Sequence, residues 1–161
     1  MDFCFKNMKS VFGITGIIIL IAIQSCKKTE EVSPIPSIEL EYIQVNNNGF
    51  IDTSASVKIF YRDGDGDLGS LNDNTAQKEN VFVRAYEKKN GVFSFLIDQN
   101  ATMPNLTPTA SNKSIEGEIE YLLQLPLQVN NDTLYYEVYI QDRAGHKSNV
   151  VKTKEIVVTT F

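Results

Sequence analysis

The chain has 161 residues, of which 42% are hydrophobic and 22% charged, a composition typical of folded globular proteins and not of disordered ones. Its formal net charge is −5, and removing residues 1–25 leaves about −6 by the same count. This acidic balance, without a cluster of Lys or Arg, excludes nucleic acid from the expected partners, because phosphate binding draws on grouped basic side chains.

Residues 1–25 have the order of a secretory signal peptide, with Lys6 and Lys9 ahead of an apolar run over residues 11–23. Met8 is an alternative start, since MKSVFG opens a more compact signal. The run is short for a membrane span, and Lys27 and Lys28 follow it at once, which disfavours the alternative of a single-pass anchor. The segment is therefore expected to be removed from the mature protein.

The signal ends in Ile23-Gln24-Ser25-Cys26. This tetrapeptide resembles the bacterial lipobox, although Gln24 stands where a small residue is commoner. The resemblance implies that the chain is cleaved before Cys26, so that Cys26 becomes the N-terminus and carries acyl chains. Two or three such chains suffice for stable membrane anchoring. The sequence therefore predicts a lipoprotein of the cell envelope, tethered to a membrane through Cys26 and not spanning it.

Residues 26–36 are expected to form an extended tether, because KKTEEVSPIPS combines charges, Ser and two prolines. Glu30 and Glu31 lie close behind the cysteine and resemble the surface-export signals of some Gram-negative lipoproteins. That resemblance implies the outer membrane and favours its outer face, with a periplasm-facing domain as the alternative.

From residue 37 onward, the sequence alternates apolar and polar residues in short runs, the period of half-buried strands. Asn90-Gly91 between two of the runs is a strong hairpin signal. The expected strands are centred on residues 38–42, 57–61, 81–86, 92–97, 115–123, 134–140 and 150–158. About seven strands separated by turn residues predict an all-β antiparallel sandwich over residues 37–161. Cys4 and Cys26 precede this domain, so it contains no disulfide.

The stretch LYYEVYIQDRAGHKSN, from Leu134 to Asn149, resembles the penultimate strand and following hairpin of immunoglobulin-like and fibronectin type III-like modules of bacterial surface proteins. The resemblance implies an immunoglobulin-like sandwich in which Tyr135 or Tyr136 forms a tyrosine corner, its hydroxyl bonded to main chain. Residues 98–114 are long and polar for a connection in such a module, and such loops are either functional or mobile.

The most conspicuous polar motif is Arg62-Asp-Gly-Asp-Gly-Asp-Leu-Gly69, with carboxylates at Asp63, Asp65 and Asp67. Three oxygen ligands at alternate positions, separated by glycine, suit Ca²⁺. In an immunoglobulin-like sandwich, Asp142 would follow a strand that ends at the same end of the domain and would join them. We therefore expect Ca²⁺ as a structural cofactor bound by these aspartates. The alternative is a solvated turn, since Asp and Gly also form turns.

Catalytic chemistry is not expected. His146, the only histidine, lies in a turn and is expected to be exposed without a role, and no cysteine other than Cys26 remains in the mature chain. Glu116, Glu118 and Glu120 alternate along a strand and indicate its solvated face. An enzyme using the aspartate cluster around a catalytic metal is the least favoured interpretation.

The expected function is a non-catalytic binding or assembly module, with an envelope protein or a glycan as partner. Phe82, Tyr86, Tyr135 and Tyr139 fall on the face opposite the first core stripe, where rings could stack on sugar or pack within the sheet. A carbohydrate-binding accessory lipoprotein of a glycan-uptake system and a purely structural envelope subunit are the alternatives.

Overall fold

The computed structural model describes residues 32–71, 78–106, 113–126 and 132–159. The chain divides into two units, Met1–Glu31 and Val32–Phe161, and all described residues belong to the second. The expected signal peptide, Cys26 and the first part of the expected tether lie outside the described residues.

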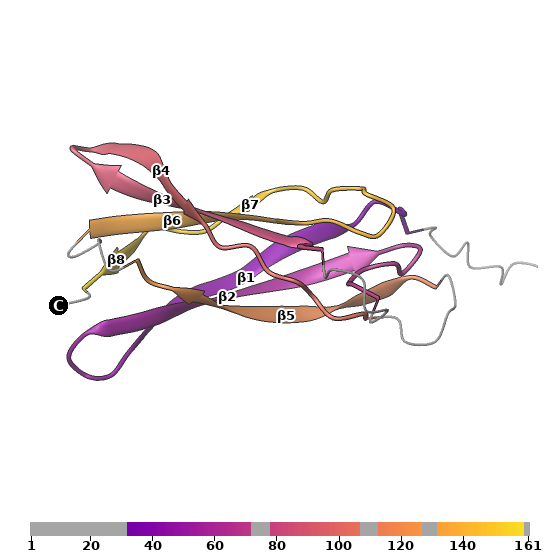
Figure 1. The fold of residues 1–161 in the computed structure, drawn as a ribbon, viewed down its shortest axis with the longest axis horizontal. Helices are drawn as coiled ribbons and strands as arrows, with labels where there is room; N and C mark the ends of the chain where they lie inside the picture. The colour runs from indigo at the N-terminus through magenta and orange to yellow at the C-terminus, as the bar shows by residue number, and fades with distance from the viewer. Residues whose placement is uncertain (1–31, 72–77, 107–112, 127–131, 160–161) are drawn as a thin grey trace, which may run out of the picture. The chain divides into compact units, whose positions relative to one another are not determined.

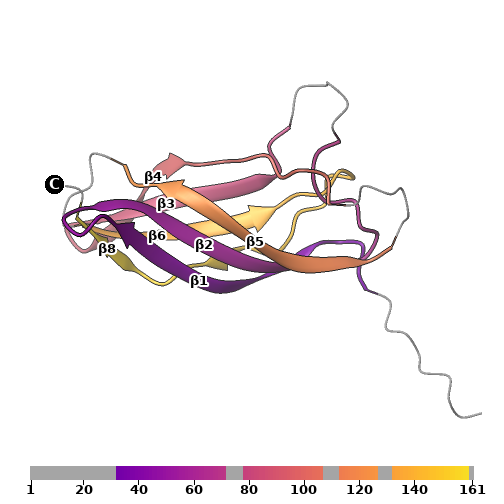
Figure 2. The same cartoon turned by 90° about the horizontal axis from the view of Figure 1, so that it is seen from below.

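Every regular element among the described residues is a strand, and the strands form two antiparallel sheets that pack face to face (Figure 1). The strands are β1 (Ser37–Asn47), β2 (Asp52–Asp63), β3 (Val81–Lys89), β4 (Val92–Asp98), β5 (Ile115–Gln124), β6 (Asp132–Ile140), β7 (Val151–Lys152) and β8 (Ile156–Val158). One sheet has the order β1-β2-β5, and the other has the order β4-β3-β6-β7 with β8 also paired to β6 (Figure 2). The predicted all-β sandwich is confirmed.

The described residues form eight strands where about seven were expected, because the expected last strand is interrupted. β7 and β8 pair with successive parts of β6. Between them, the hydroxyl of Thr153 accepts a hydrogen bond from the Tyr136 amide at 2.9 Å, and the Thr153 amide donates to the Tyr136 carbonyl at 2.9 Å. A buried Thr side chain thus replaces part of the main-chain ladder and breaks the strand.

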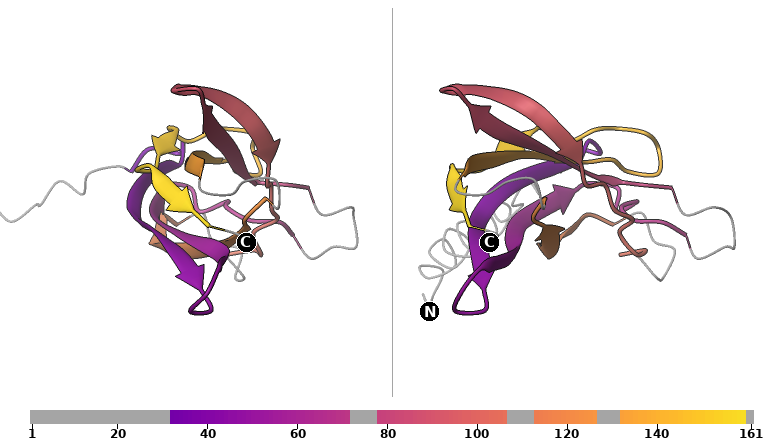
Figure 3. Two further views of the ribbon diagram at one scale, coloured as in Figure 1. Left: turned by 90° about the vertical axis from the view of Figure 1, so that its left-hand side faces the viewer. Right: turned by 60° about the vertical axis from the view of Figure 1, so that its left-hand side comes forward.

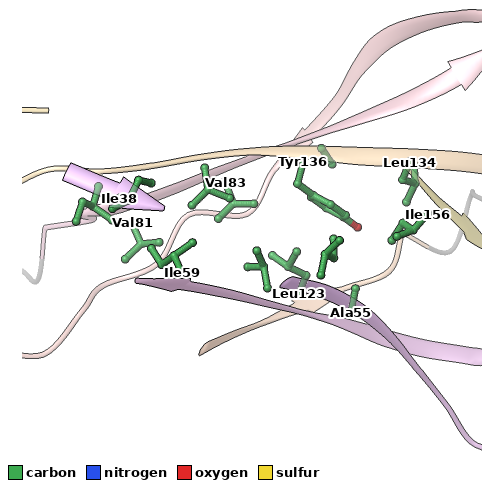
Figure 4. Packing of buried hydrophobic residues seen from close by; sticks show 14 of the residues in the cluster. Ile38, Ala55, Ile59, Val81, Val83, Leu123, Leu134, Tyr136 and Ile156 are labelled. Carbon is green, nitrogen blue, oxygen red and sulfur yellow. The ribbon is translucent and has the colours of Figure 1, made fainter. Parts of the chain in front are cut away.

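The core lies between the two sheets, where apolar side chains from both inner faces meet (Figure 4). Alternation explains its composition, because every second residue of β6 points inward and Leu134, Tyr136 and Val138 are at most 1% exposed. The Tyr136 ring extends from β6 toward Leu123 of β5.

Among the described residues, neither Tyr135 nor Tyr136 donates a hydroxyl hydrogen bond to main chain, so the expected tyrosine corner is not seen there. The buried hydroxyl of Tyr136 has no hydrogen-bond partner among the described residues. Tyr135 points to the other face of the sheet, where its ring stacks on Tyr86 at 4.8 Å. The expectation was wrong because the paired tyrosines were placed by resemblance, and alternation sends one into the core and the other outward.

The first strand does not alternate regularly as expected, because it contains a β-bulge. Ile38 and Leu40 face the core as expected, but the register of β1 against β2 shifts between Leu40 and Tyr42. The inward positions therefore become Ile43 and Val45, while Tyr42 is 38% exposed. An inserted residue changes which face each later side chain occupies, and periodicity alone does not reveal it.

The predicted Asn-Gly hairpin is confirmed between β3 and β4. Asn90 and Gly91 have φ of 53° and 81°, and positive φ at both central residues is the requirement of a type I′ turn. The β3–β4 hairpin stands out from the rest of the strands (Figure 3).

The first part of the long connection after β4 is packed against the sandwich and held by both side-chain and main-chain contacts. Met103 is 4% exposed, and its amide donates to the Asn80 side chain at 2.6 Å. Ala101 bridges to Val81 of β3. Residues 107–112 of this connection lie outside the described residues.

Candidate metal centre

The Asp-Gly motif begins at the last residue of β2. Asp63 pairs with Ile115 of β5 and is 0% exposed, so its carboxylate is carried into the end of the sandwich by the strand itself. Its Oδ2 accepts a hydrogen bond from the Asp67 amide at 2.9 Å, which turns the loop back on itself. The loop thus places one buried carboxylate at its base and a second, Asp67, above it.

Each of the three glycines of the motif lies in close contact with the main chain of another segment. A Cβ atom at Gly64 would collide with the carbonyls of residues 32 and 33, one at Gly66 with that of Lys113, and one at Gly69 with that of Pro104. Gly66 and Gly69 also have positive φ, of 69° and 88°. Glycine is therefore required here for close approach, and the loop is a junction of several chain segments.

The turn after β6 supplies the next carboxylate. Asp142 is 7% exposed and lies at the end of the sandwich that also holds Asp63. Its Oδ1 accepts from the His146 amide at 2.7 Å, and its Oδ2 lies 2.8 Å from His146 Nδ1. The Ala144 amide of the same turn donates to Asp67 Oδ2 at 3.0 Å and so fixes the turn to the Asp-Gly loop.

Carboxylate oxygens of Asp63, Asp67 and Asp142 come together within 4.8 Å of one another. Among the described residues, the Oδ1 atoms of Asp63, Asp65 and Asp67 are buried and have no hydrogen-bond partner. Buried polar atoms are nearly always bonded, so three unpartnered anionic oxygens in one loop require a physical explanation.

Electrostatics make this arrangement costly when no cation is bound. Burial and the charge of Asp65 raise the pKa of Asp63 to about 6, and burial and the charge of Asp142 raise the pKa of Asp67. Two unit charges about 5 Å apart repel by about 3 kcal/mol at an effective dielectric constant of about 20. The folded protein therefore keeps these carboxylates together against their mutual repulsion.

Arg143 supports the site without neutralising it. Its Nη1 donates to the carbonyls of Leu68 and Gly69 at 3.1 and 3.2 Å and to Asn105 Oδ1 at 3.3 Å. The guanidinium lowers the pKa of Asp67, but less than burial raises it. Arg143 thus holds the end of the loop through its carbonyls, and the aspartate charges remain largely uncompensated.

The donor set suits a hard cation. The oxygens that converge are carboxylates, and Ca²⁺ takes six to eight oxygen ligands from carboxylates, carbonyls and water. The one nearby ring nitrogen, His146 Nδ1, already contacts Asp142 Oδ2. Asp63, Asp67 and Asp142 would be the direct ligands, and Asp65 Oδ1 lies in the same loop without a partner among the described residues.

The structure thus brings three of the four expected metal ligands together, Asp65 falling outside the group that lies within 4.8 Å. His146 is exposed as expected, but it is not without a contact, because it orients Asp142. The one sequence signal for that role is its position four residues after Asp142. Arg143 has no such signal, since its partners are two main-chain carbonyls and the Asn105 side chain, which lies 38 residues away in sequence.

The expected aromatic face is present on the outer side of the β4-β3-β6-β7 sheet. Phe82 stacks on Tyr139 at 4.7 Å and Tyr86 on Tyr135 at 4.8 Å, both pairs within 8° of parallel. Lys152 Nζ lies 3.7 Å from the centroid of the Tyr135 ring. The ring faces therefore contact one another and, at Tyr135, a lysine ammonium group.

Within the described residues, no helix is long and apolar enough to cross a membrane. Comparison of the chain with protein-family models, curated proteins and solved structures found no match.

Proposed function

We propose that the end of the sandwich binds Ca²⁺ through Asp63, Asp67 and Asp142, with Asp65 contributing from the same loop. The observation that carries this proposal is the Oδ1 atom of Asp63, which belongs to a side chain 0% exposed and has no partner among the described residues. A divalent cation would bond to this atom and offset the repulsion between the carboxylates.

A structural role for the cation is favoured over a catalytic one. A catalytic metal needs an open position for water and substrate. Asp63 is 0% exposed and Asp142 is 7% exposed, and the glycines of the loop are covered by neighbouring main chain. The cation would hold the β2–β3 connection to the turn after β6, which stabilises the end of the sandwich.

We further propose that the chain is a lipoprotein of the bacterial cell envelope, anchored through acylated Cys26, whose domain is a non-catalytic binding or assembly module. The lipobox-like sequence supports the anchor. The sheet orders β1-β2-β5 and β4-β3-β6-β7 support the immunoglobulin-like and fibronectin type III-like resemblance, because three connections cross between the sheets, as in Greek-key sandwiches.

An assembly partner is favoured over a glycan. Sugar binding by stacking needs exposed ring faces, whereas the faces of Tyr86 and Tyr135 lie against each other. Carbohydrate binding and a purely structural subunit remain the alternatives. A protein partner crosslinked in cells would support assembly, and retention on polysaccharide gels would support the glycan.

The cation proposal is tested by thermal unfolding of the full chain in detergent with and without Ca²⁺. At one hundred times its dissociation constant, a ligand stabilises the native state by about 2.7 kcal/mol, which amounts to several degrees in Tm. We expect Ca²⁺ to raise Tm by that amount and chelator to reverse the effect. An unchanged Tm in both conditions would refute the site.

Asp63→Asn and Asp98→Asn form a matched pair for this experiment. Asp63→Asn removes the buried charge, so Tm in chelator should rise while the response to Ca²⁺ is lost. Asp98 is a half-exposed residue that pairs with Arg84 of β3 at 3.6 Å and is not one of the clustered carboxylates, so Asp98→Asn should keep the full response. Loss of the response in both variants would indicate a nonspecific effect.

The anchor is tested by labelling cells with palmitate. The wild-type chain should incorporate label and fractionate with membranes, and Cys26→Ser should do neither. Absence of label in the wild-type chain would exclude lipidation and leave the cation site unaffected.

A further inference from the structure

We infer that cation binding at the Asp63, Asp67 and Asp142 cluster docks the segment before β1, residues 32–35, onto the sandwich, so that cation occupancy controls how this segment is held. The inference rests on the cation site proposed above and adds to it a mechanical coupling. The contact that carries the coupling lies within the Asp-Gly motif.

Gly64 connects the Asp-Gly loop to the segment before β1. Its amide donates a hydrogen bond to the Ser33 carbonyl at 2.9 Å, and the absence of a side chain lets the carbonyls of residues 32 and 33 lie against its Cα. Gly64 is also the residue between Asp63 and Asp65, two carboxylates with unpartnered oxygens among the described residues. Any opening of the loop by repulsion between carboxylates therefore displaces the residue that holds Ser33.

The docked segment can leave without unfolding the sandwich. Residues 32–35 are exposed, whereas Pro36 is buried. Beyond it, the Asn149 side chain accepts from the Ile38 amide and donates to the Ile38 carbonyl, each at 2.9 Å, so the start of β1 is held independently. Pro34 and Pro36 have no amide hydrogen to extend strand pairing toward Ser33. The natural limit of detachment is therefore Pro36.

The same loop carries both the repulsion and the contact. Without a cation, the clustered carboxylates repel one another across the loop, whereas a single main-chain hydrogen bond from Gly64 holds Ser33. Repulsion within the loop therefore weakens the contact at Ser33. With a cation bound, the loop closes and the contact is retained.

The coupling bears on how the domain is tethered. Residues 32–35 lead toward Cys26 along the chain. Docking removes these residues from the free length of the tether, and undocking returns them to it. In a calcium-poor medium, the domain would gain reach from its anchor, and in a calcium-rich medium it would be held more closely.

Hydrogen–deuterium exchange of the full chain in detergent tests the inference directly. We expect Ca²⁺ to slow exchange of the Gly64 amide about tenfold, a typical size for coupling between two sites. Amides of β6 serve as the internal reference, since they lie in the core sheet and should change less. Calorimetric titration with Ca²⁺ on the same preparation reports binding separately.

Gly64→Ala provides the complementary variant. The φ of Gly64 lies outside the left-handed region, so alanine meets no backbone strain there, and its Cβ would collide with the main chain of residues 32 and 33 so that this contact must open. Because coupling is reciprocal, we expect Gly64→Ala to weaken Ca²⁺ binding about tenfold. Gly117→Ala is the control, since Gly117 also lacks a positive φ and the atoms nearest its added Cβ would belong to the Tyr61 side chain, at 2.9–3.2 Å, and not to residues 32 and 33.

The outcomes separate the coupling from the site. If Ca²⁺ binds but leaves exchange at Gly64 unchanged, or if Gly64→Ala binds Ca²⁺ as tightly as wild type, the coupling is wrong and the cation site stands. If Ca²⁺ does not bind at all, both are wrong. Slower exchange at Gly64 together with weakened binding in Gly64→Ala, and not in Gly117→Ala, supports the coupling.

Discussion

Asp63 is a buried carboxylate whose hydrogen bonding is incomplete. The strand that carries it also buries it, and only one of its two carboxylate oxygens receives a hydrogen bond from the described residues. Burial then raises the pKa of Asp63 to about 6, well above the 3.8 of a free side chain. Protons would therefore compete with the proposed cation for the same carboxylate, and the stability of the protein should depend on both.

The first prediction is that stability responds to pH in opposite directions with and without Ca²⁺. In calcium-free buffer, native Asp63 binds its proton more tightly than unfolded Asp63. Stability should therefore be highest near pH 4 and fall by on the order of 2 kcal/mol as pH rises through 6. In saturating Ca²⁺, acidification protonates the ligands, so stability should fall with falling pH. Urea unfolding at pH 4.5 and 7 measures both.

Asp63→Asn is the control for this pH dependence. The variant has no titrating group at that position, so the calcium-free difference between the two pH values should become smaller. An unchanged difference would assign the effect to other carboxylates, such as Asp67.

Tyr136 gives the second prediction. Its hydroxyl is buried without a partner among the described residues, and burial raises its pKa to about 12. Removing an unsatisfied buried hydroxyl relieves its desolvation, so Tyr136→Phe should leave the free energy of unfolding unchanged or raise it by about 1 kcal/mol. Chemical denaturation measures the change. A loss of more than about 1 kcal/mol would reveal a hydroxyl bond of the kind expected in a tyrosine corner.

At the scale of elements, the edges of the two sheets differ in how they are protected. β5 carries exposed Glu116, Glu118 and Glu120, β1 carries exposed Glu39 and Glu41, and β7 and β8 are short. β4 has no charge from residue 92 to residue 97, and Val92, Phe95 and Ile97 are 69%, 56% and 45% exposed. Apart from a register shift opposite Ala85 and Tyr86, this edge lacks the usual devices against strand pairing.

The third prediction is that aggregation on heating begins at β4. Phe95→Lys places a charge on the exposed edge, and since Phe95 is more than half exposed, the folded state should lose little stability. The variant should therefore scatter less light on heating at nearly the same Tm. Phe50→Lys is the matched control, because Phe50 is 92% exposed but lies in the β1–β2 hairpin. Equal protection by both substitutions would point to net charge as the cause.

Strand positions could be predicted from the sequence because alternation reports burial directly. Each of the seven expected segments coincides with observed strand, the last being divided in two. Alternation did not predict two irregularities, the bulge at Glu41 and the interruption at Thr153. Both depend on hydrogen bonds to other strands. Such contacts have no local signature.

At the scale of the whole molecule, the meeting of Asp142 with Asp63 and Asp67 followed from topology, because strands that run the same way end at the same end of a sandwich. The supporting residues were not predictable in this way. The glycine contacts of the loop involve residues 32, 33 and 104 and Lys113, which lie far away in sequence and bind through main-chain atoms. Nearly every residue carries the same main-chain atoms, so the sequence does not reveal which residues make these contacts.

The glycines also divide the molecule into a closed end and an open end. A side chain added at Gly49 in the β1–β2 hairpin or at Gly91 in the β3–β4 hairpin would meet nothing within 4 Å, in contrast to the three glycines of the Asp-Gly loop. β2 runs from the first of these hairpins to Asp63, so the β1–β2 hairpin lies at the far end from the aspartates. Epitope tags or fluorophores inserted at that tip should be accepted by the fold and leave the proposed cation site intact, so the folded protein can be labelled there.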